Sequence, residues 1–263
     1  MFRDLFSTEV SNLNNEFLSS AHKPFSHVVV KDLLEEVYLR SCYKEFVSLS
    51  QNNLDKFVRY SDRDFEFEKY TLNKVDEMPE LLSQLCRKLH SQEFVDLIEK
   101  ITGLKGLKVD PNRWGGGLHM TQKGGYLACH KDFSVLPTTF DTTKQLLRVI
   151  NIIGYLTPGW VPGWGGELEL WDAEGAALEK KLAPEFNNWV IFDTRGSFHG
   201  HPYPYEGNEP RYSVAAYYYL EEEVGREDWI STNYLKLPWK NDTPEYQQRR
   251  KDRANIEHRY KLK

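Results

Sequence analysis

The run Leu146-Leu147-Arg148-Val149-Ile150-Asn151-Ile152-Ile153-Gly154-Tyr155-Leu156 is short, mostly apolar and rich in β-branched residues, and it lacks the spacing of an amphipathic helix. Further apolar runs follow it between turn residues, at positions 167–171, 189–192 and 212–220. Strands of this length and spacing, with few helices between them, favour a β-sandwich or jelly roll over a parallel α/β sheet. We therefore expect a jelly roll from about residue 104 onward.

Upstream of this β-region the pattern is mainly helical. Residues 24–30 predict a strand, because a β-branched run after a proline suits an extended backbone. Helices are expected over residues 31–50 with Asp32 as the N-cap, over residues 79–90, and over residues 91–102, where Gly103 ends the helix. Their apolar stripes are expected to pack in the core, so that the fold is α+β, with N-terminal helices supporting the jelly roll.

The chain has 263 residues, a formal net charge of −5 and 40% hydrophobic residues. Length and composition indicate a folded protein with a substantial core. We expect one catalytic unit over residues 1–263, with a mainly helical support region (1–103), a jelly-roll core (104–220) and a charged C-terminal extension (221–263). For that extension a solvated helix or frayed end is favoured over a lid or an oligomer contact.

Composition also bears on location and partners. No apolar run reaches the ~18 to 20 residues of a membrane helix, so no membrane association is expected. The N-terminus lacks an apolar signal core, which favours a cytoplasmic protein, and mild acidity argues against a nucleic-acid partner. The cysteines Cys42, Cys86 and Cys129 lie far apart in the sequence and are expected to be reduced thiols.

The chemistry is concentrated in His130-Lys131-Asp132, an HxD motif. In a strand, residues i and i+2 point to the same face, so imidazole and carboxylate could reach one metal ion. His199 follows the run at 189–192, and Arg211 opens the next one. Two imidazoles and one carboxylate leave open metal positions, as in non-haem Fe(II) oxygenases. An arginine at the start of a strand suits a bidentate grip on a carboxylate, here the distal carboxylate of 2-oxoglutarate.

The segment from about Gly115 to Tyr219 resembles the 2-oxoglutarate/Fe(II)-dependent dioxygenases, and among them the prolyl 4-hydroxylase-like branch. The motifs that carry the resemblance are GYLACHKD (125–132), RVINIIGYL (148–156), GGELELW (165–171), DTRGSFHG (193–200) and RYSVAAYYY (211–219). Their order and spacing match the family along about a hundred residues. The resemblance implies a double-stranded β-helix, the cupin-like jelly roll, as the core.

The resemblance also implies roles for single residues. The catalytic, metal-binding group would be His130, Asp132 and His199, which hold Fe(II). Arg211 would pair with the C5 carboxylate of 2-oxoglutarate, and Tyr155 would help to hold this cosubstrate. Asn151 faces the same way as Tyr155 along its strand and is expected to be a further pocket residue.

Several residues have more than one interpretation. His201 is a rival to His199 as the distal ligand, although the spacing from residues 189–192 favours His199. His119 could line the substrate entrance or make an ordinary hydrogen bond. Arg148 and Glu169 could form an ion pair across strands or contact substrate. Cys129 is expected to pack beside His130 rather than to bind metal, and the tyrosines at 217–219 should alternate between core and cavity.

The function implied by the resemblance is hydroxylation of an unactivated C–H bond with O2 and 2-oxoglutarate, releasing succinate and CO2, with ascorbate as a reductant. A prolyl residue of a peptide or protein is the expected substrate, and a free amino acid or another small molecule is the alternative. A non-redox cupin-like metalloprotein and a binding module on an inactive jelly roll are the competing classes. The loop between His199 and Arg211 is a few residues longer than in the animal oxygen-sensing prolyl hydroxylases, which belong to the branch that this segment resembles. It also contains three prolines, so the substrate preference of those enzymes need not apply to this chain.

Overall fold

A computed structural model of the protein describes residues 7–140, 142–226 and 229–255. The helices are α1 (Ser7–Ser19), α2 (Glu36–Asn52), α3 (Glu80–Leu89), α4 (Gln92–Thr102) and α5 (Pro244–Ala254), with 3-10 turns η1 (Leu54–Lys56), η2 (Val75–Glu77) and η3 (Pro137–Thr139). The strands are β1 (His27–Lys31), β2 (Val58–Asp62), β3 (Glu66–Leu72), β4 (Lys108–Val109), β5 (Gly117–Lys131), β6 (Gln145–Tyr155), β7 (Leu168–Trp171), β8 (Leu178–Leu182), β9 (Asn188–Asp193), β10 (Phe198–His201), β11 (Arg211–Glu222) and β12 (Asn233–Tyr234).

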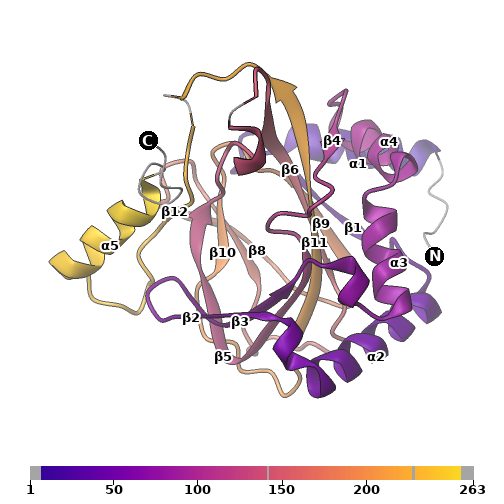
Figure 1. Cartoon of the computed structure of the whole chain (residues 1–263), viewed down its shortest axis with the longest axis horizontal. Helices are drawn as coiled ribbons and strands as arrows, with labels where there is room; N and C mark the ends of the chain where they lie inside the picture. The colour runs from indigo at the N-terminus through magenta and orange to yellow at the C-terminus, as the bar shows by residue number, and fades with distance from the viewer. Residues whose placement is uncertain (1–6, 141, 227–228, 256–263) are drawn as a thin grey trace.

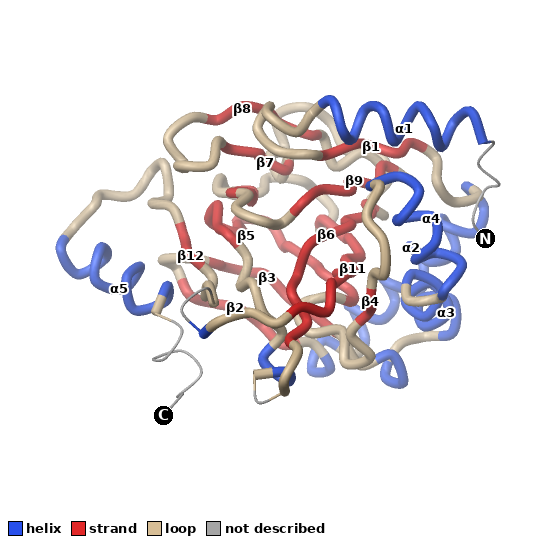
Figure 2. Tube along the Cα trace, turned by 90° about the horizontal axis from the view of Figure 1, so that it is seen from above, coloured by secondary structure: helices blue, strands red, loops and turns tan. Residues whose placement is uncertain are grey.

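The strands of the described ranges form one curled antiparallel sheet. Its main path runs β1-β9-β6-β11-β5-β10-β7-β8, and the hairpin β2–β3, the short β4 and β12 attach to it. β5 is the central strand, because its two edges together pair with β11, β3, β10 and β12. The helices α1 to α4 cover one side of the sheet, and α5 lies at the opposite end beside β12 (Figures 1 and 2). The jelly roll with supporting N-terminal helices, expected from the sequence, is confirmed.

The largest core cluster fills the space between these helices and the sheet. Phe46 of α2 lies 4.6 Å from the ring of Tyr212, and Tyr218 donates a hydrogen bond to the carbonyl of Leu89 at the end of α3. On β6, Gly154 lies flat against the ring of Trp189, where any Cβ would collide with the indole. Burial of these aromatic rings joins the helical layer to the sheet.

The helical layer follows the sequence pattern with one correction. α4 begins after Ser91, whose side chain accepts a hydrogen bond from the Phe94 N–H, and ends at Gly103 in the left-handed conformation (φ 77°). The prediction of Asp32 as the N-cap of the helix expected over residues 31–50 is wrong, because that helix, α2, begins only at Glu36. Asp32 still belongs to the sheet edge, since its N–H bonds to the carbonyl of Asn187.

Two segments were not anticipated in the N-terminal region. One is α1, and the other is the β2–β3 hairpin, whose second strand pairs with β5 from Glu66 opposite Leu127 to Leu72 opposite Leu118. The alternation of aromatic and charged residues along 65–70 is the signal that would have indicated this strand. The hairpin matters for function because it forms one wall of the main cavity.

The described part of the C-terminal extension contains the helix α5, in which Tyr246 is the one buried residue, so the solvated helix favoured from the sequence describes most of its length. Thr243 caps α5 by accepting a hydrogen bond from the Tyr246 N–H, and the Tyr246 ring is buried with its hydroxyl donating to the carbonyl of Asp64. Residues 256–263 lie outside the described ranges. None of the described helices is both long and apolar enough to span a lipid bilayer.

Candidate active site

The two histidines proposed as metal ligands lie on neighbouring strands. His130 is the penultimate residue of β5 and pairs directly with His199 of β10 in the antiparallel register, while Asp132 lies one residue past the end of β5. His130 Nε2 is 3.4 Å from Asp132 Oδ1, and His199 Nε2 is 3.9 Å from Asp132 Oδ2. One ligand atom from each of the three residues lies within 4.8 Å of the others.

The three side chains fit a divalent metal ion. Asp132 Oδ2 is buried and accepts no hydrogen bond from the described residues, so it has a free coordinating oxygen. His130 Nδ1 lies 3.0 Å from the carbonyl of Ala128, and donation there leaves Nε2 as the lone-pair nitrogen on the Asp132 side. Two imidazoles with one carboxylate form the ligand set of non-haem Fe(II) oxygenases, which leaves positions for other ligands.

The electrostatics favour the metal-binding protonation states of Asp132 and His199. Burial opposes the charge of Asp132, but the Arg148 guanidinium and the neighbouring His130 hold the carboxyl pKa well below its usual range. Burial, together with the charge of His130, lowers the pKa of His199 to about 4. At neutral pH the carboxylate is therefore ionised and the His199 imidazole neutral, as metal ligation requires.

Arg148 is buried directly behind Asp132. Its Nη1 lies 3.5 Å from Asp132 Oδ1, and the guanidinium carbon lies 3.7 Å from the ring centroid of Phe133 and 3.6 Å from that of Tyr217. The Arg148–Glu169 ion pair considered from the sequence does not form. Glu169 of β7 pairs with Lys181 of β8 at 2.9 Å, because β7 neighbours β8 and β10 rather than β6.

Arg211 and Tyr155 lie together on the inner face of the sheet. The Arg211 guanidinium carbon is 4.8 Å from the centroid of the Tyr155 ring, and Arg211 Nε donates to the carbonyl of Gly166 at 2.8 Å. Arg211 is only 6% exposed, and no carboxylate of the described chain forms an ion pair with it. The Tyr155 hydroxyl is also buried without a hydrogen-bond partner in the described ranges. A buried cation of this kind calls for an anion from outside the chain.

The proposed metal ligands and Arg211 line one cavity of about 430 Å³. Asn151 lines it as well, with its side-chain oxygen buried and unbonded within the described structure. Tyr217 faces this cavity, whereas Tyr218 faces the helices, as the expected alternation requires. Glu66 and Lys69 of β3 and Tyr234 of β12 complete the wall, and none of these three was singled out from the sequence.

The rival residues have other positions. His201 also lines the cavity, but it is paired with Leu127 and does not belong to the group of converging ligand atoms. Burial and the charge of Arg211 keep the pKa of His201 well below its usual value. His119 faces the cavity with Nε2 3.1 Å from the carbonyl of Gly115. Cys129 is a buried free thiol with its Sγ 3.9 Å from Glu169, on the side away from the ligands.

Comparison with known proteins agrees with this geometry. Residues 115–219 match the family model of the 2OG-Fe(II) oxygenase superfamily, which confirms the resemblance expected from the sequence. This family implies Fe(II), 2-oxoglutarate and O2. The structure has a group of two histidines and one aspartate that could hold the metal ion. No curated protein sequence matches the chain.

Solved structures share the fold at low sequence identity. A prolyl hydroxylase from Trichoplax adhaerens, in complex with a hypoxia inducible factor peptide, has a TM-score of 0.55 and 15% identity, covering 81% of this chain and 91% of its own. A prolyl 4-hydroxylase from Phytophthora capsici has a TM-score of 0.54 and 18% identity, covering 98% and 80%. The α-ketoglutarate-dependent epimerase SnoN of nogalamycin biosynthesis has a TM-score of 0.55 and 13% identity, covering 89% and 92%.

Proposed function

We propose that this chain, whose residues 115–219 match the 2OG-Fe(II) oxygenase superfamily, is an Fe(II)- and 2-oxoglutarate-dependent dioxygenase that hydroxylates an unactivated C–H bond. The observation that carries the proposal is Arg211, a buried arginine without an acidic partner among the described residues, in the same cavity as a group of two histidines and one carboxylate. A metal site alone would not require such a cation, whereas a dicarboxylate cosubstrate requires a cation to bind its second carboxylate.

Each residue has a defined part in this proposal. His130, Asp132 and His199 would hold the iron, and Arg211 with the Tyr155 hydroxyl would bind the C5 carboxylate of 2-oxoglutarate. Bound iron supplies the activation of O2, with which 2-oxoglutarate is converted to succinate and CO2 and one oxygen atom enters the substrate C–H bond. The walls of the cavity would orient the substrate carbon. Ascorbate is proposed as the reductant that keeps the iron in its ferrous state.

The prolyl residue of a peptide or protein remains our first candidate for the substrate, supported by the prolyl hydroxylases among the similar structures. A free amino acid or another small molecule is the second candidate. It is favoured by the charged side chains Glu66 and Lys69 on the cavity wall and by a small-molecule enzyme among the similar structures. We further propose that residues 1–263 act as a single catalytic unit in the cytoplasm.

The competing classes predict a different response to cosubstrate. A non-redox cupin-like metalloprotein or an inactive jelly roll has no need for the Arg211 and Tyr155 pair. Thermal unfolding is therefore measured with Mn(II) alone and with Mn(II) plus N-oxalylglycine, an unreactive analogue of 2-oxoglutarate. Additional stabilisation by the analogue supports the proposal, because only a ligand that binds the folded state raises the melting temperature.

Single-residue variants test which side chains bind the metal ion and which bind the cosubstrate. Arg211→Ala should lose the increment caused by N-oxalylglycine while it keeps the increment caused by Mn(II). His199→Ala should lose the Mn(II) increment, whereas His201→Ala should retain it. Iron-loaded wild-type protein should convert 2-oxoglutarate to succinate in the presence of ascorbate. Folded, iron-loaded protein that neither binds nor turns over 2-oxoglutarate would overturn the proposal.

A further inference from the structure

A third cation faces the cavity from the strand that the sequence patterns did not reveal. Lys69 of β3 pairs with Thr121 of β5, and Thr121 pairs on its other side with Arg211 of β11. Residues opposite each other on neighbouring strands project to the same face, and all three line the cavity. At about 4.8 Å per strand spacing, Lys69 and Arg211 stand roughly 10 Å apart across the sheet.

The other two cations of the cavity already have partners or a proposed ligand. Arg148 forms an ion pair with Asp132, and its Nη2 donates to the carbonyl of Trp114 at 3.0 Å and to the Tyr219 hydroxyl at 3.3 Å. Arg211 is assigned above to 2-oxoglutarate. The Lys69 ammonium bonds to one acceptor in the described chain, Glu66 Oε2 at 3.2 Å, and its side chain is 14% exposed. Its Nζ also lies 4.9 Å from the centroid of the Tyr60 ring. Because an ammonium has three donors and a ring face has no oxygen or nitrogen acceptor, hydrogen-bonding capacity remains for a ligand.

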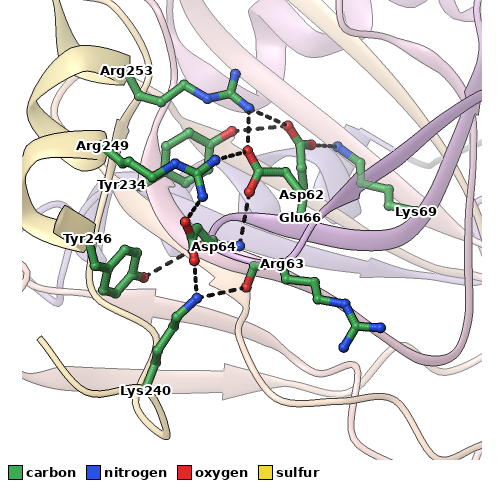
Figure 3. Close-up of polar contacts among 10 residues, drawn as sticks. All are labelled: Asp62, Arg63, Asp64, Glu66, Lys69, Tyr234, Lys240, Tyr246, Arg249 and Arg253. Atoms are coloured by element: carbon green, nitrogen blue, oxygen red, sulfur yellow. Dashed lines mark hydrogen bonds and ion pairs between the residues drawn. The ribbon is translucent and has the colours of Figure 1, made fainter. Parts of the chain in front are cut away.

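Glu66 neutralises the charge of Lys69 only in part, because the Glu66 carboxylate also interacts with two other residues. Its Oε1 accepts a hydrogen bond from the Tyr234 hydroxyl at 3.4 Å and lies 3.8 Å from Arg253 of α5 (Figure 3). Arg253 does not line the cavity. The Tyr234 ring lies 5.3 Å from the ring of His130. Glu66 therefore holds Lys69 on the cavity wall, while an arginine outside the cavity shares the same carboxylate.

The charges that line the cavity do not balance. Among the described residues that line it, the cations are Lys69, Arg148 and Arg211 and the anions are Glu66 and Asp132, which leaves one positive charge. Iron(II) and the 2-oxoglutarate dianion cancel each other, so the excess persists when both are bound. An uncompensated charge among side chains that are largely buried is unfavourable, and an anionic group on the substrate would neutralise it.

From these contacts we propose that Lys69 is the substrate anchor of this enzyme and binds a carboxylate of the primary substrate. This inference rests on the function proposed above and narrows its substrate class to carboxylate-bearing compounds. The carboxylate has two sources, the α-carboxylate of a free amino acid or an acidic side chain beside the target residue of a peptide.

Matched probes separate the sources. Protein loaded with Mn(II) and N-oxalylglycine is titrated with L-proline, with acetylated and amidated Asp-Pro-Ala, and with Ala-Pro-Ala capped in the same way. The free L-amino acids are compared with their N-acetyl amides in parallel. A carboxylate-bearing probe is expected to bind about tenfold or more tightly than its uncharged partner. Preference for the free amino acid identifies the first source, and preference for the acidic peptide the second.

Lysine variants test the residue itself. Lys69→Met should reduce the affinity of the preferred probe to that of its uncharged partner, and Lys69→Arg should preserve most of the preference. Lys74→Met is the matched control, because Lys74 is exposed, pairs with Glu77 and does not line the cavity. Circular dichroism of each variant confirms that it is folded.

Three results would overturn the inference. In the first, no carboxylate-bearing probe binds more tightly than its uncharged partner, although N-oxalylglycine stabilises the protein; the proposed function then stands without this anchor. In the second, Lys69→Met loses stabilisation by N-oxalylglycine, which places Lys69 in the cosubstrate site. In the third, N-oxalylglycine does not stabilise wild-type protein, and the inference falls together with the proposed function.

Discussion

The guanidinium of Arg148 lies between the rings of Phe133 and Tyr217 with its Nη1 3.5 Å from Oδ1 of Asp132. The second oxygen of Asp132, Oδ2, is the one that accepts no hydrogen bond within the described chain and lies nearest His199. The two oxygens therefore have separate tasks. Oδ1 is oriented by Arg148, and Oδ2 is available to the metal ion.

Replacement of Arg148 should weaken metal binding. In Arg148→Met the side chain can still fill the space between the two rings, but Asp132 loses its cation and its pKa rises. We expect the affinity for Mn(II), measured by calorimetry near neutral pH, to fall by about 10- to 100-fold. The affinity should also decrease more steeply as the pH falls. Arg195→Met is the control, since Arg195 is half exposed and pairs with Asp193. Equal affinities of the two variants would contradict this role.

The candidate metal group could be predicted only in part from local spacing. His130 and Asp132 are two residues apart. His199 comes from β10, whose pairing with β5 is long-range, and its role was inferred from the motif that the family resemblance supplies. The partners of Arg148 and Glu169 could not be predicted in this way, because they depend on strand order. β6 lies beside β9 and β11, whereas β7 lies beside β8 and β10, and no local pattern contains that information.

The same limit applies to the cavity wall. Lys69 and Glu66 contact the site only because β3 pairs with β5, more than fifty positions later in the chain. Tyr234 reaches His130 from the C-terminal extension, where composition indicated only a charged segment. Side chains brought in by long-range pairing carry no motif, so they emerge only from the three-dimensional structure.

Stability should decrease on the acid side of neutrality. Among the described residues, five histidines have lowered pKa values, chiefly because of burial: His27, His90, His119, His199 and His201. Below the unfolded-state pKa of about 6.5 the unfolded chain takes up protons that the folded chain excludes, so the free energy of unfolding falls as the pH falls. Each such histidine contributes up to about 1.4 kcal/mol per pH unit.

His119→Gln tests this linkage without touching a proposed metal ligand. The pKa of His119 is lowered to about 3, by burial and then by the charge of Lys69. The variant therefore removes one group that binds a proton near pH 5 in the unfolded chain but not in the folded chain. Denaturant unfolding of metal-free protein at about pH 7 and about pH 5 should show a smaller loss of stability in the variant than in wild type. His22→Gln, at an exposed position, should behave like wild type. An identical pH dependence in all three proteins would refute this contribution.

The C-terminal helix should stabilise the hairpin through ion pairs. Arg249 of α5 contacts both Asp62 and Asp64, and Lys240 contacts Asp64 from the opposite side (Figure 3). Asp64 is only 12% exposed in its side chain, so this network is less screened than an isolated surface pair. Arg249→Met should lower the free energy of unfolding by about 1 kcal/mol in low salt and by less in high salt.

Arg250→Met is the matched control on the same helix. Arg250 pairs with Asp242, whose side chain is 39% exposed, and it forms no ion pair with the described residues of the hairpin, although its guanidinium carbon lies 5.3 Å from the centroid of the Tyr246 ring. Its loss should cost a few tenths of a kcal/mol. Equal effects of the two variants in denaturant unfolding would show that the contacts with Asp62 and Asp64 add nothing to the stability of the fold.

Gly166 should be required for the position of Arg211. It has φ 80°, its carbonyl accepts the hydrogen bond from Arg211 Nε, and a Cβ would lie 2.9 Å from Arg211 Cδ. Gly166→Ala should therefore displace the guanidinium and weaken binding of N-oxalylglycine to Mn(II)-loaded protein by about tenfold or more, with Mn(II) affinity retained.

Gly163→Ala separates this displacement from backbone strain. Gly163 also has a positive φ, 96°, but a Cβ there would meet no atom within 4 Å. Both variants carry a strain of about 1–2 kcal/mol for an alanine in this conformation, and only Gly166→Ala adds the contact with Arg211. N-oxalylglycine affinity, measured by calorimetry, should therefore be near the wild-type value in Gly163→Ala. If the affinity for N-oxalylglycine fell equally in both variants, the loss would be caused by backbone strain in the 159–166 loop rather than by the approach of Gly166 to Arg211.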